Sequence, residues 1–344
     1  MSVGLNDRPA LMSKQTWLTG ITTSGTPHLG NYVGAIRPAV EASHDRDQEG
    51  FYFLADYHAL IKNQDPQLLR QSRQEISAAW LALGLDTDHA TFYRQSDIPE
   101  IPELTWILTC LTAKGLMNRA HAYKGVVQEN LDAEASDADK GITMGLFSYP
   151  ILMSADILMF KATHVPVGRD QIQHLEMARD IAQRFNHHYG NHLVMPQVVV
   201  EERAALLRGL DGRKMSKSYG NTIPLFETSK KLRKAIMKIK TNSQEPGEPK
   251  DPEGNTVFEI YKAFASESQC NELKQAYLDG IGWGDAKQQL FEVVDGVLSE
   301  PRERYDELMA DPSRIEKILT RGGEKAREHS RLYLQQLRRA VGVA

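Results

Sequence analysis

Short apolar stretches alternate with helical patterns along the first half of the chain, and this alternation constrains the fold more than any other feature. Strands are predicted at Gln15–Ile21, Phe51–Asp56, Ala90–Arg94 and Thr163–Val167, and helices from Asn31 to about His44, at Pro66–Leu83, Ile101–Ala120 and Gly141–Phe160, and from Gln171 to about His188. The second strand is apolar at successive positions, as a parallel strand buried on both faces should be. We therefore expect an α/β fold built on a doubly wound parallel sheet.

From Thr228 onward the predicted elements are all helices. They cover Ser229–Lys240, Val257–Phe264, a short segment from near Cys270, about Asp285–Leu308 and Pro312–Val341, and we expect Pro301 and Gly322-Gly323 to interrupt the last two. The segment 241–256 is predicted to be a loop, and the acidic segment Gln128–Lys140 a mobile loop. Because 344 residues exceed what one core usually serves, two domains are expected: 1–227 around the sheet, with a helical insertion at about 100–160, and an all-α domain at 228–344.

The most specific stretch is Gly212–Ser218, where Lys214 and Lys217 stand three residues apart among small residues. Two ammonium groups in such a loop can reach one phosphate chain, although a plain charged surface loop is the ordinary alternative. A second stretch, Thr26–Asn31, follows the first predicted strand and begins the first helix. Exposed amides at such a helix start favour phosphate, although a simple strand-to-helix turn would have the same pattern.

Charge and cysteine content limit the classes of protein to consider. The net charge is −4, so the overall charge does not indicate a nucleic-acid-binding protein. A local basic face could still bind nucleic acid. Segment 229–240 holds six Lys or Arg and no acidic residue, and either a solvated or a phosphate-facing helix face would explain it. Cys110 and Cys270 lie far apart with no CxxC pair, which argues against a cysteine-based metal site and favours a reducing compartment. Without a signal-like N-terminus or a membrane span, we expect a cytoplasmic protein.

The two stretches together resemble the HIGH and KMSKS motifs of class I aminoacyl-tRNA synthetases. The first is His28-Leu29-Gly30-Asn31, and the second, 214–218, matches letter for letter. The resemblance is closest to the bacterial tryptophanyl-tRNA synthetases and extends from Thr19 to Gly342. The other matching stretches are Gly20–Gly25, Tyr32–Ala35, Tyr149–Leu158 and Val165–Gln171.

The resemblance implies a Rossmann-like catalytic domain that joins L-tryptophan to ATP, releases pyrophosphate and transfers tryptophan to the 3' end of tRNA(Trp). His28, Asn31, Lys214 and Lys217 would be catalytic. The implied ATP-binding residues are Thr22, Thr23, Ser24, His28, Gly30, Asn31, Gly168, Arg169, Asp170, Lys214, Met215, Ser216, Lys217 and Ser218. The implied tryptophan-binding residues are Tyr149, Met153, Asp156, Val165, Val167 and Gln171, with Asp156 accepting the indole N–H.

The resemblance also implies that Mg²⁺ arrives on the nucleotide, so no metal site made of protein ligands alone is expected. A homodimer is implied, with the helical domain reading the anticodon, and we expect the arginine-rich last helix to contact tRNA. Neither DNA nor a membrane is an expected partner. A buried carboxylate is a suitable acceptor for an indole N–H, which can only donate.

Three positions depart from the family pattern. Asn31 replaces the second His of the first motif, Thr22-Thr23 stand where some members have Gln-Pro, and Leu18 stands where an aromatic ring often faces the indole. Three other functions are to be considered: a tyrosyl-tRNA synthetase, a nucleotidyltransferase of the same superfold, and a non-catalytic RNA-binding relative. The last is expected to lack His28 or one of the two lysines, and the chain has all three.

Overall fold

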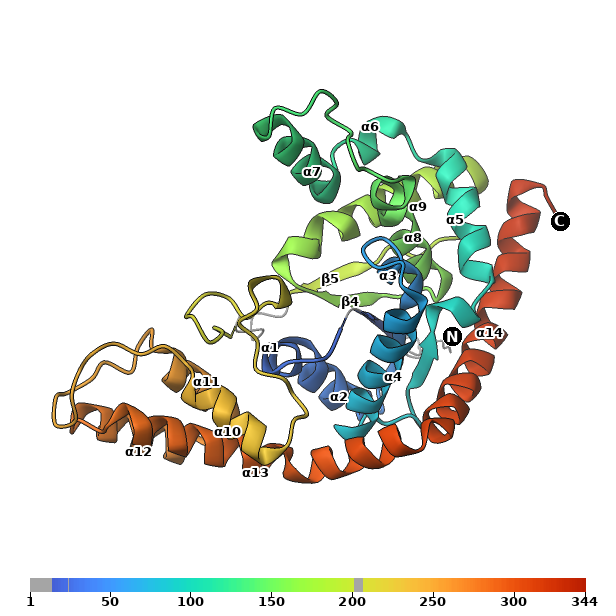
Figure 1. The fold of residues 1–344 in the computed structure, drawn as a ribbon. Coiled ribbons are helices and arrows are strands. Elements are labelled where there is room, and N and C mark those ends of the chain that lie inside the picture. The colour runs from blue at the N-terminus through green and yellow to red at the C-terminus, as the bar shows by residue number, and fades with distance from the viewer. Residues whose placement is uncertain (1–13, 24, 201–206) are drawn as a thin grey trace, which may run out of the picture.

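A parallel five-stranded sheet lies at the centre of the computed structural model, which describes residues 14–23, 25–200 and 207–344 (Figure 1). Its strands are β1 (Gln15–Thr22), β2 (Gln48–Ala55), β3 (Thr91–Arg94), β4 (His164–Val167) and β5 (Gln197–Val200), in the order β3-β2-β1-β4-β5. The four predicted strands are confirmed. Strand β5 was not predicted, because it is only four residues long and partly exposed and so has neither a long apolar run nor clear alternation.

The strand order places the candidate ligand site. The chain passes from β3 back across the sheet to β4, so β1 and β4 are neighbours whose connections leave in opposite directions. In open α/β sheets, ligands bind beyond the carboxyl ends of the strands at such a switch point. Here that position is occupied by the loops that follow Thr22 and Val167.

The sheet separates two apolar clusters, as expected for strands with side chains pointing alternately to its two faces. Tyr52 and Leu54 of β2 belong to one cluster, and Phe51 and Phe53 belong to the other. The first cluster includes side chains of α2 (Arg37–Ser43) and α4 (Pro66–Ala82). The second includes those of α5 (Glu100–Leu111), α8 (Met144–Met159) and α9 (Ile172–Tyr189). The predicted doubly wound architecture is therefore confirmed.

The other α-helices described before the lysine loop are α1 (Leu29–Asn31), α3 (Asp56–Ala59), α6 (Lys114–Met117) and α7 (His121–Asp132), and the short 3-10 and π segments are η1 (Tyr32–Ile36), η2 (Gln95–Asp97) and η3 (Arg169–Gln171). Two predictions differ from the structure here. The helix predicted over Ile101–Ala120 is broken at Thr112, where the backbone becomes extended. The segment predicted as a mobile loop is helical up to Asp132, where an amide from Gln128 donates to the Asp132 carboxylate at 2.8 Å. That i,i+4 pair supports a helix despite the polar composition.

The remaining helices are α10 (Ser229–Met237), α11 (Thr256–Phe264), α12 (Glu267–Leu278), α13 (Trp283–Ala310) and α14 (Pro312–Val341). Pro301 and the Gly322-Gly323 pair do not interrupt α13 and α14, contrary to prediction. Helices α10 and α11 pack against α13, which also reaches α4. Figure 1 shows α14 turning back along the outer side of the sheet, beside β3 and α5.

Helix α14 covers the edge strand β3, and its glycines allow the close approach. A Cβ at Gly322 would lie 1.7 Å from the carbonyl oxygen of Phe92. Nearby, Arg94 forms ion pairs with Asp97 at 2.7 Å and with Glu316 of α14 at 2.8 Å. A helix over this edge protects it from pairing with other chains.

This packing also uses basic side chains that were expected to contact tRNA. Arg321 pairs with Asp88, Arg327 with Glu100 and Arg338 with Glu103, while Lys325 donates to the carbonyl of His89. Arg331 and Arg339 remain exposed. The structure therefore gives four basic side chains of α14 a role in holding this helix against the residues around the sheet, which sequence periodicity could not reveal.

We expect Gly322→Ala to lower the free energy of unfolding by about 1–3 kcal/mol, because the added methyl group must displace backbone atoms of β3. Gly296→Ala in α13 is the matched control, since a Cβ there meets nothing within 4 Å, and it should raise the free energy by about 0.5–1 kcal/mol. Urea unfolding followed by circular dichroism measures both. Equal effects of the two substitutions would contradict the close approach.

Candidate active site

The two motif loops are joined directly by backbone hydrogen bonds. The amide of Leu29 donates to the carbonyl of Ile223 at 3.0 Å, and the amide of Leu225 donates to the carbonyl of Pro27 at 3.0 Å. These bonds flank a bridge between His28 and Pro224. The segment that follows the lysine loop is therefore paired with the start of α1, at the carboxyl end of β1.

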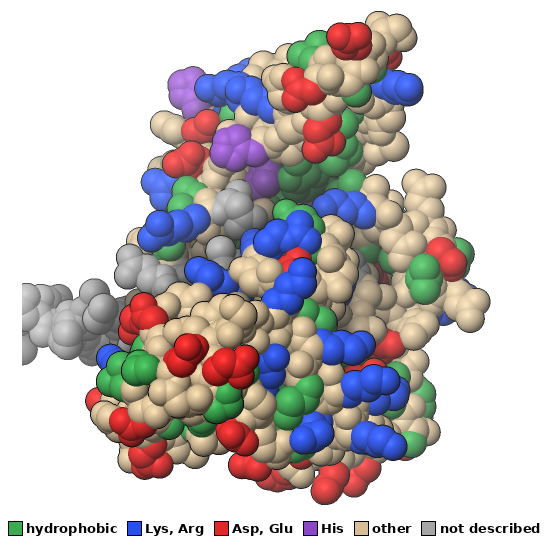
Figure 2. Space-filling view, turned by 60° about the vertical axis from the view of Figure 1, so that its left-hand side comes forward, with side chains coloured by type: hydrophobic (Ala, Val, Ile, Leu, Met, Phe, Trp, Pro, Cys, Tyr) green, Lys and Arg blue, Asp and Glu red, His purple; other side chains and the backbone are tan. Residues whose placement is uncertain are grey.

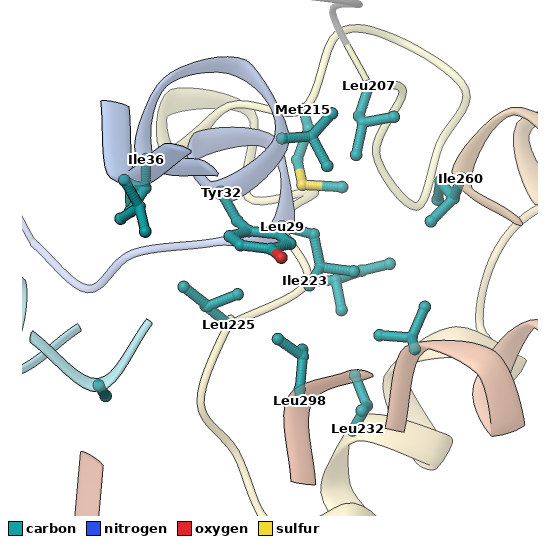
Figure 3. Close-up of a cluster of buried hydrophobic side chains, with 14 of the residues drawn as sticks. Leu29, Tyr32, Ile36, Leu207, Met215, Ile223, Leu225, Leu232, Ile260 and Leu298 are labelled. Atoms are coloured by element: carbon teal, nitrogen blue, oxygen red, sulfur yellow. The ribbon is translucent and has the colours of Figure 1, made fainter. Parts of the chain in front are cut away.

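Side chains on both sides of this pairing form one apolar cluster. Figure 3 shows Leu29 and Tyr32 next to Met215, Ile223 and Leu225, with Leu207 nearby. Met215 is 4% exposed, and its amide donates to the carbonyl of Leu207 at 2.8 Å. The side chain of this residue, predicted to bind ATP, therefore packs in the core and fixes the lysine loop against α1.

His28 and Asn31 form a reciprocal cap at the start of α1. The Asn31 amide N–H donates to His28 Nδ1 at 3.2 Å, and the His28 N–H donates to Asn31 Oδ1 at 3.1 Å. Because Nδ1 accepts, the proton of the neutral ring is on Nε2, which is then a donor. The substitution of Asn for the second His of the motif thus produces a capping box rather than a second ring donor.

Burial and the neighbouring Lys217 ammonium lower the pKa of His28 to about 4. The ring is only 7% exposed, so protonation would place a charge in a poorly solvated position beside another cation. At pH 7 the imidazole is neutral. It can donate one hydrogen bond from Nε2 without carrying a positive charge.

The lysine loop is shaped by a buried amide. Asn221, 3% exposed, accepts from the Ser216 N–H at 2.8 Å and donates to the Lys214 carbonyl at 3.0 Å and to Asp211 at 2.7 Å. Gly220 next to it adopts the left-handed conformation, with φ +61°, which glycine adopts without strain. Lys214 and Lys217 are both exposed, as phosphate-binding side chains should be.

Lys217 reaches across to the first loop. A Cβ at Gly25, which has φ +62°, would lie 3.3 Å from Lys217 Nζ, so this position favours glycine for both backbone conformation and space. Partial burial here lowers the pKa of Lys217, while the Glu75 carboxylate opposes that shift. Gly30 is similarly confined, because a Cβ there would lie 3.0 Å from His28 Nδ1.

Two residues of α4 support this arrangement, and sequence analysis did not identify them. Ser72 Oγ accepts from the Gly25 N–H at 2.9 Å, and Glu75 accepts from the Thr26 hydroxyl at 2.8 Å. Both are buried, on the same helix face as Ile76. The helical period places Glu75 on the buried face of α4. A carboxylate at such a position indicates a partner, because buried acids are usually paired.

The remaining residues predicted to bind ATP lie near the ends of β1 and β4. Thr22 is exposed, while Thr23 is buried and its hydroxyl has no hydrogen-bond partner among the described residues. Gly168 and Arg169 are exposed in the turn after β4. The hydroxyls of Ser216 and Ser218 are 2.8 Å apart. Ser24 and the Asp170 side chain lie outside the described part of the structure.

Asp156 projects from α8 into a polar centre within the second apolar cluster. It is 1% exposed, and its Oδ2 lies 2.9 Å from His58 Nε2. The amide of Gln95 donates to Oδ1 at 2.8 Å and to Oδ2 at 2.9 Å. Burial raises the pKa of Asp156, and the hydrogen bonds from His58 and Gln95 oppose this shift. His58 lies in α3, directly after β2, and Gln95 lies in a short 3-10 helix directly after β3, so no spacing in the sequence links them to Asp156.

A second polar chain connects α8 to α9. The Tyr149 hydroxyl lies 2.8 Å from His174 Nε2, and His174 Nδ1 lies 2.9 Å from Gln171 Oε1. Because an amide oxygen only accepts, Nδ1 of a neutral His174 carries the proton and Nε2 accepts from Tyr149. His174 is buried and was not predicted, while the structure brings the predicted Tyr149 and Gln171 together through it.

Apolar residues predicted to bind the indole also gather on this side of the sheet. Val165 is buried in the second cluster, and Met153 and Val167 pack against it while remaining partly exposed. Leu18 is 2% exposed in the same cluster. The His58 and Tyr149 rings are nearly perpendicular, with their centroids 6.1 Å apart. One region between β1, β4 and α8 thus combines apolar walls with a buried acid.

The described residues include no group of three or more His, Cys, Asp or Glu side chains arranged to hold a metal ion. Likewise, no helix in the described ranges is both long and apolar enough to cross a bilayer.

Comparison with known proteins gives consistent matches along the chain. The family model described as tRNA synthetases class I (W and Y) matches residues 12–299. A tryptophan–tRNA ligase of Neisseria meningitidis is 60% identical over 332 residues, covering 96% of this chain and 99% of that relative. One of Pseudomonas aeruginosa is 60% identical over 95% of this chain and 73% of its own length. The crystal structure of tryptophanyl-tRNA synthetase from Campylobacter jejuni with ADP and tryptophan superimposes with a TM-score of 0.86 at 42% identity, covering 95% of this chain and all of that one.

The electrostatics of His28 can be tested by titration. We expect a pKa of about 4 for this ring, so the folded state binds the proton less readily than the unfolded state, whose value is near 6.5. The contribution of His28 to stability is therefore complete above pH 6.5 and is lost as the pH falls towards 4. Lys217→Gln should raise the pKa while leaving it below 6.5, because burial is the larger cause. NMR of labelled histidine measures both values, and an unshifted ring in the parent chain would contradict this account.

Proposed function

The chain belongs to the class I tRNA synthetases of the tryptophan and tyrosine family, and we propose the following mechanism for its activity as a tryptophan–tRNA ligase. The enzyme activates L-tryptophan with ATP, giving tryptophanyl-adenylate and pyrophosphate, and then transfers tryptophan to the 3' end of tRNA(Trp). Relatives at about 60% identity over nearly the whole chain support this reaction.

In the first step the tryptophan carboxylate attacks the α-phosphorus of ATP, and the bond to pyrophosphate breaks. Negative charge then grows on the phosphate oxygens, so fixed donors and cations accelerate the reaction. Lys214 and Lys217 supply exposed positive charge, and the neutral His28 supplies a donor from Nε2 beside the start of α1. ATP enters as its Mg²⁺ complex, so the metal belongs to the substrate.

Recognition of tryptophan rests on Asp156. The indole N–H is a donor without lone pairs to offer, so the pocket needs an acceptor. Asp156 is the buried acid in the apolar region, and two donors hold its carboxylate in one orientation. A phenol O–H can also donate to a carboxylate, so the choice of tryptophan over tyrosine rests on the position of this acceptor relative to the ring walls. We assign Met153, Val165 and Val167 to the ring walls, and Tyr149 and Gln171 to the substrate amino group.

Pyrophosphate exchange without tRNA tests both the reaction and the pocket. We expect exchange into ATP with tryptophan and not with tyrosine. Asp156→Asn should lower the tryptophan-dependent kcat/KM by about 10- to 100-fold, because the buried charged acceptor is lost. Asp180→Asn, the same change at an exposed position of α9, should leave exchange unchanged. Exchange with tyrosine alone would support a tyrosyl enzyme, and exchange with neither would favour the nucleotidyltransferase or RNA-binding alternatives.

We further propose that the active form is a homodimer that works in the cytoplasm, where its tRNA is found. Trp106 on α5 is 68% exposed, and Pro102 and Cys110 are exposed four residues to either side of it on the same helix. An exposed Trp in an apolar patch is typical of an interface between subunits. Both cysteines are free thiols, which suits a reducing compartment.

Trp106→Glu should convert the dimer to a monomer at micromolar concentration, because it places a charge at the centre of that interface. Leu278→Glu on α12, where the leucine is 49% exposed, controls for the loss of an exposed apolar side chain. Sedimentation velocity distinguishes the two states. A Trp106→Glu variant that remains dimeric would place the interface elsewhere.

A further inference from the structure

We propose that the exposed lysines of α10 and its C-terminal continuation, Lys230, Lys234, Lys238 and Lys240, bind the phosphate backbone of tRNA. We call these four lysines the α10 lysine face. The inference rests on the proposed function, because it names the surface by which the same enzyme holds its nucleic-acid substrate. The sequence of segment 229–240 is compatible with a solvated helix face or with a phosphate-facing one. The proposal selects the phosphate-facing face.

Packing fixes which way α10 points. Leu232 and Ile236 are buried, as is Ile239 just after the helix, and α10 packs along α13. The lysines at 230, 234 and 238 follow the i, i+4, i+8 spacing, so they share the opposite side. All four members of the α10 lysine face are exposed. The helix therefore cannot turn its charge inward without losing its apolar contacts.

The charge on this face is not neutralised within the described structure. Of the other two basic residues of segment 229–240, Lys231 pairs with Glu227 at 3.0 Å and Arg233 donates to Gln288 at 2.9 Å. None of the four lysines lies within 4.0 Å of a carboxylate of a described residue, whereas the arginines 321, 327 and 338 of α14 all do. In a chain with a net charge of −4, such an unpaired cluster produces a local positive potential.

The α10 lysine face is continuous with the active site. The amide of Lys240 donates to the carbonyl of Leu210 at 2.8 Å, and the amide of Leu210 donates to the carbonyl of Asn221 at 2.9 Å. The face therefore begins beside the lysine loop and extends away from it along α10. Figure 2, which turns this side of the molecule forward, shows Lys and Arg side chains gathered from the middle of the view towards its lower right. On this proposal, a tRNA whose 3' end enters the active site continues across this surface.

The chemistry favours an RNA backbone over a lipid surface. Lysines act as flexible point charges for phosphates. A helix that lies on a membrane also needs an exposed apolar face, but Leu232 and Ile236 of α10 are buried. Contacts of this kind strengthen binding without reading bases. The α10 lysine face therefore positions tRNA, and sequence discrimination lies with other residues.

The test combines Lys230→Gln, Lys234→Gln and Lys238→Gln in the full-length enzyme. We expect kcat/KM for tRNA charging to fall about 10- to 100-fold, and the slope of log kcat/KM against log salt concentration to become smaller by about 2–3. Pyrophosphate exchange with tryptophan should stay at the parent level, which also shows that the variant is folded. The matched control replaces Lys262, Lys274 and Lys317, exposed lysines of α11, α12 and α14, with Gln, and should change neither the charging rate nor the slope.

The outcomes separate this inference from the proposed function. If the parent chain shows no tryptophan-dependent exchange, the proposed function fails. If the parent charges tRNA and the α10 triple variant keeps the same kcat/KM and salt slope, the inference alone is overturned. An equal loss in both triple variants would also overturn it, because the effect would then reflect total charge rather than the α10 lysine face.

Discussion

The candidate active site depends on the docking of the lysine loop against the start of α1. Two backbone hydrogen bonds, from Leu29 to Ile223 and from Leu225 to Pro27, join segments almost two hundred residues apart in the sequence. Met215 and Leu29 bury apolar surface at the same contact. Beside this contact Lys217 lies next to Gly25, and burial together with Lys217 lowers the pKa of His28. Without it, the chain would have the same side chains but no common site.

Sequence alone predicted the parts of the site that belong to contiguous stretches. His28, Lys214 and Lys217 stand in recognisable motifs, and Tyr149, Met153 and Asp156 follow the spacing of one helix. It could not predict Ser72, Glu75, His58, Gln95 and His174, which hold the motif residues from other elements. Their roles come from tertiary contacts, and a polar residue in a helical pattern has the same appearance whether it faces solvent or supports a loop. Burial is the property that separates the two, and it is decided by the whole fold.

The elements of the fold divide in the same way, into those predicted from local patterns and those decided by tertiary contacts. Four strands and the long helices were predicted because apolar periodicity is a local property, while the short strand β5 and the helical half of segment 128–140 were not. The glycine pair in α14 was expected to interrupt a helix, since glycine has a low helix propensity. In the structure it allows two backbones to touch, and this packing outweighs the propensity. The contact of the α14 arginines with tRNA stays a prediction, and their carboxylate partners on other elements are invisible in a one-dimensional pattern.

The position of α14 also affects how the protein forms during synthesis. Its arginines contact residues such as Asp88, 233 positions earlier in the chain, and its backbone covers the edge of the sheet. Chains are made from the N-terminus, and contacts this distant form only after the intervening residues exist. The edge of β3 (Thr91–Arg94) therefore stays uncovered until α14 (Pro312–Val341) has been made. Helix α14 is the element that ends this exposure, so a chain truncated before Pro312 would retain both motif loops and still present an open strand edge for aggregation.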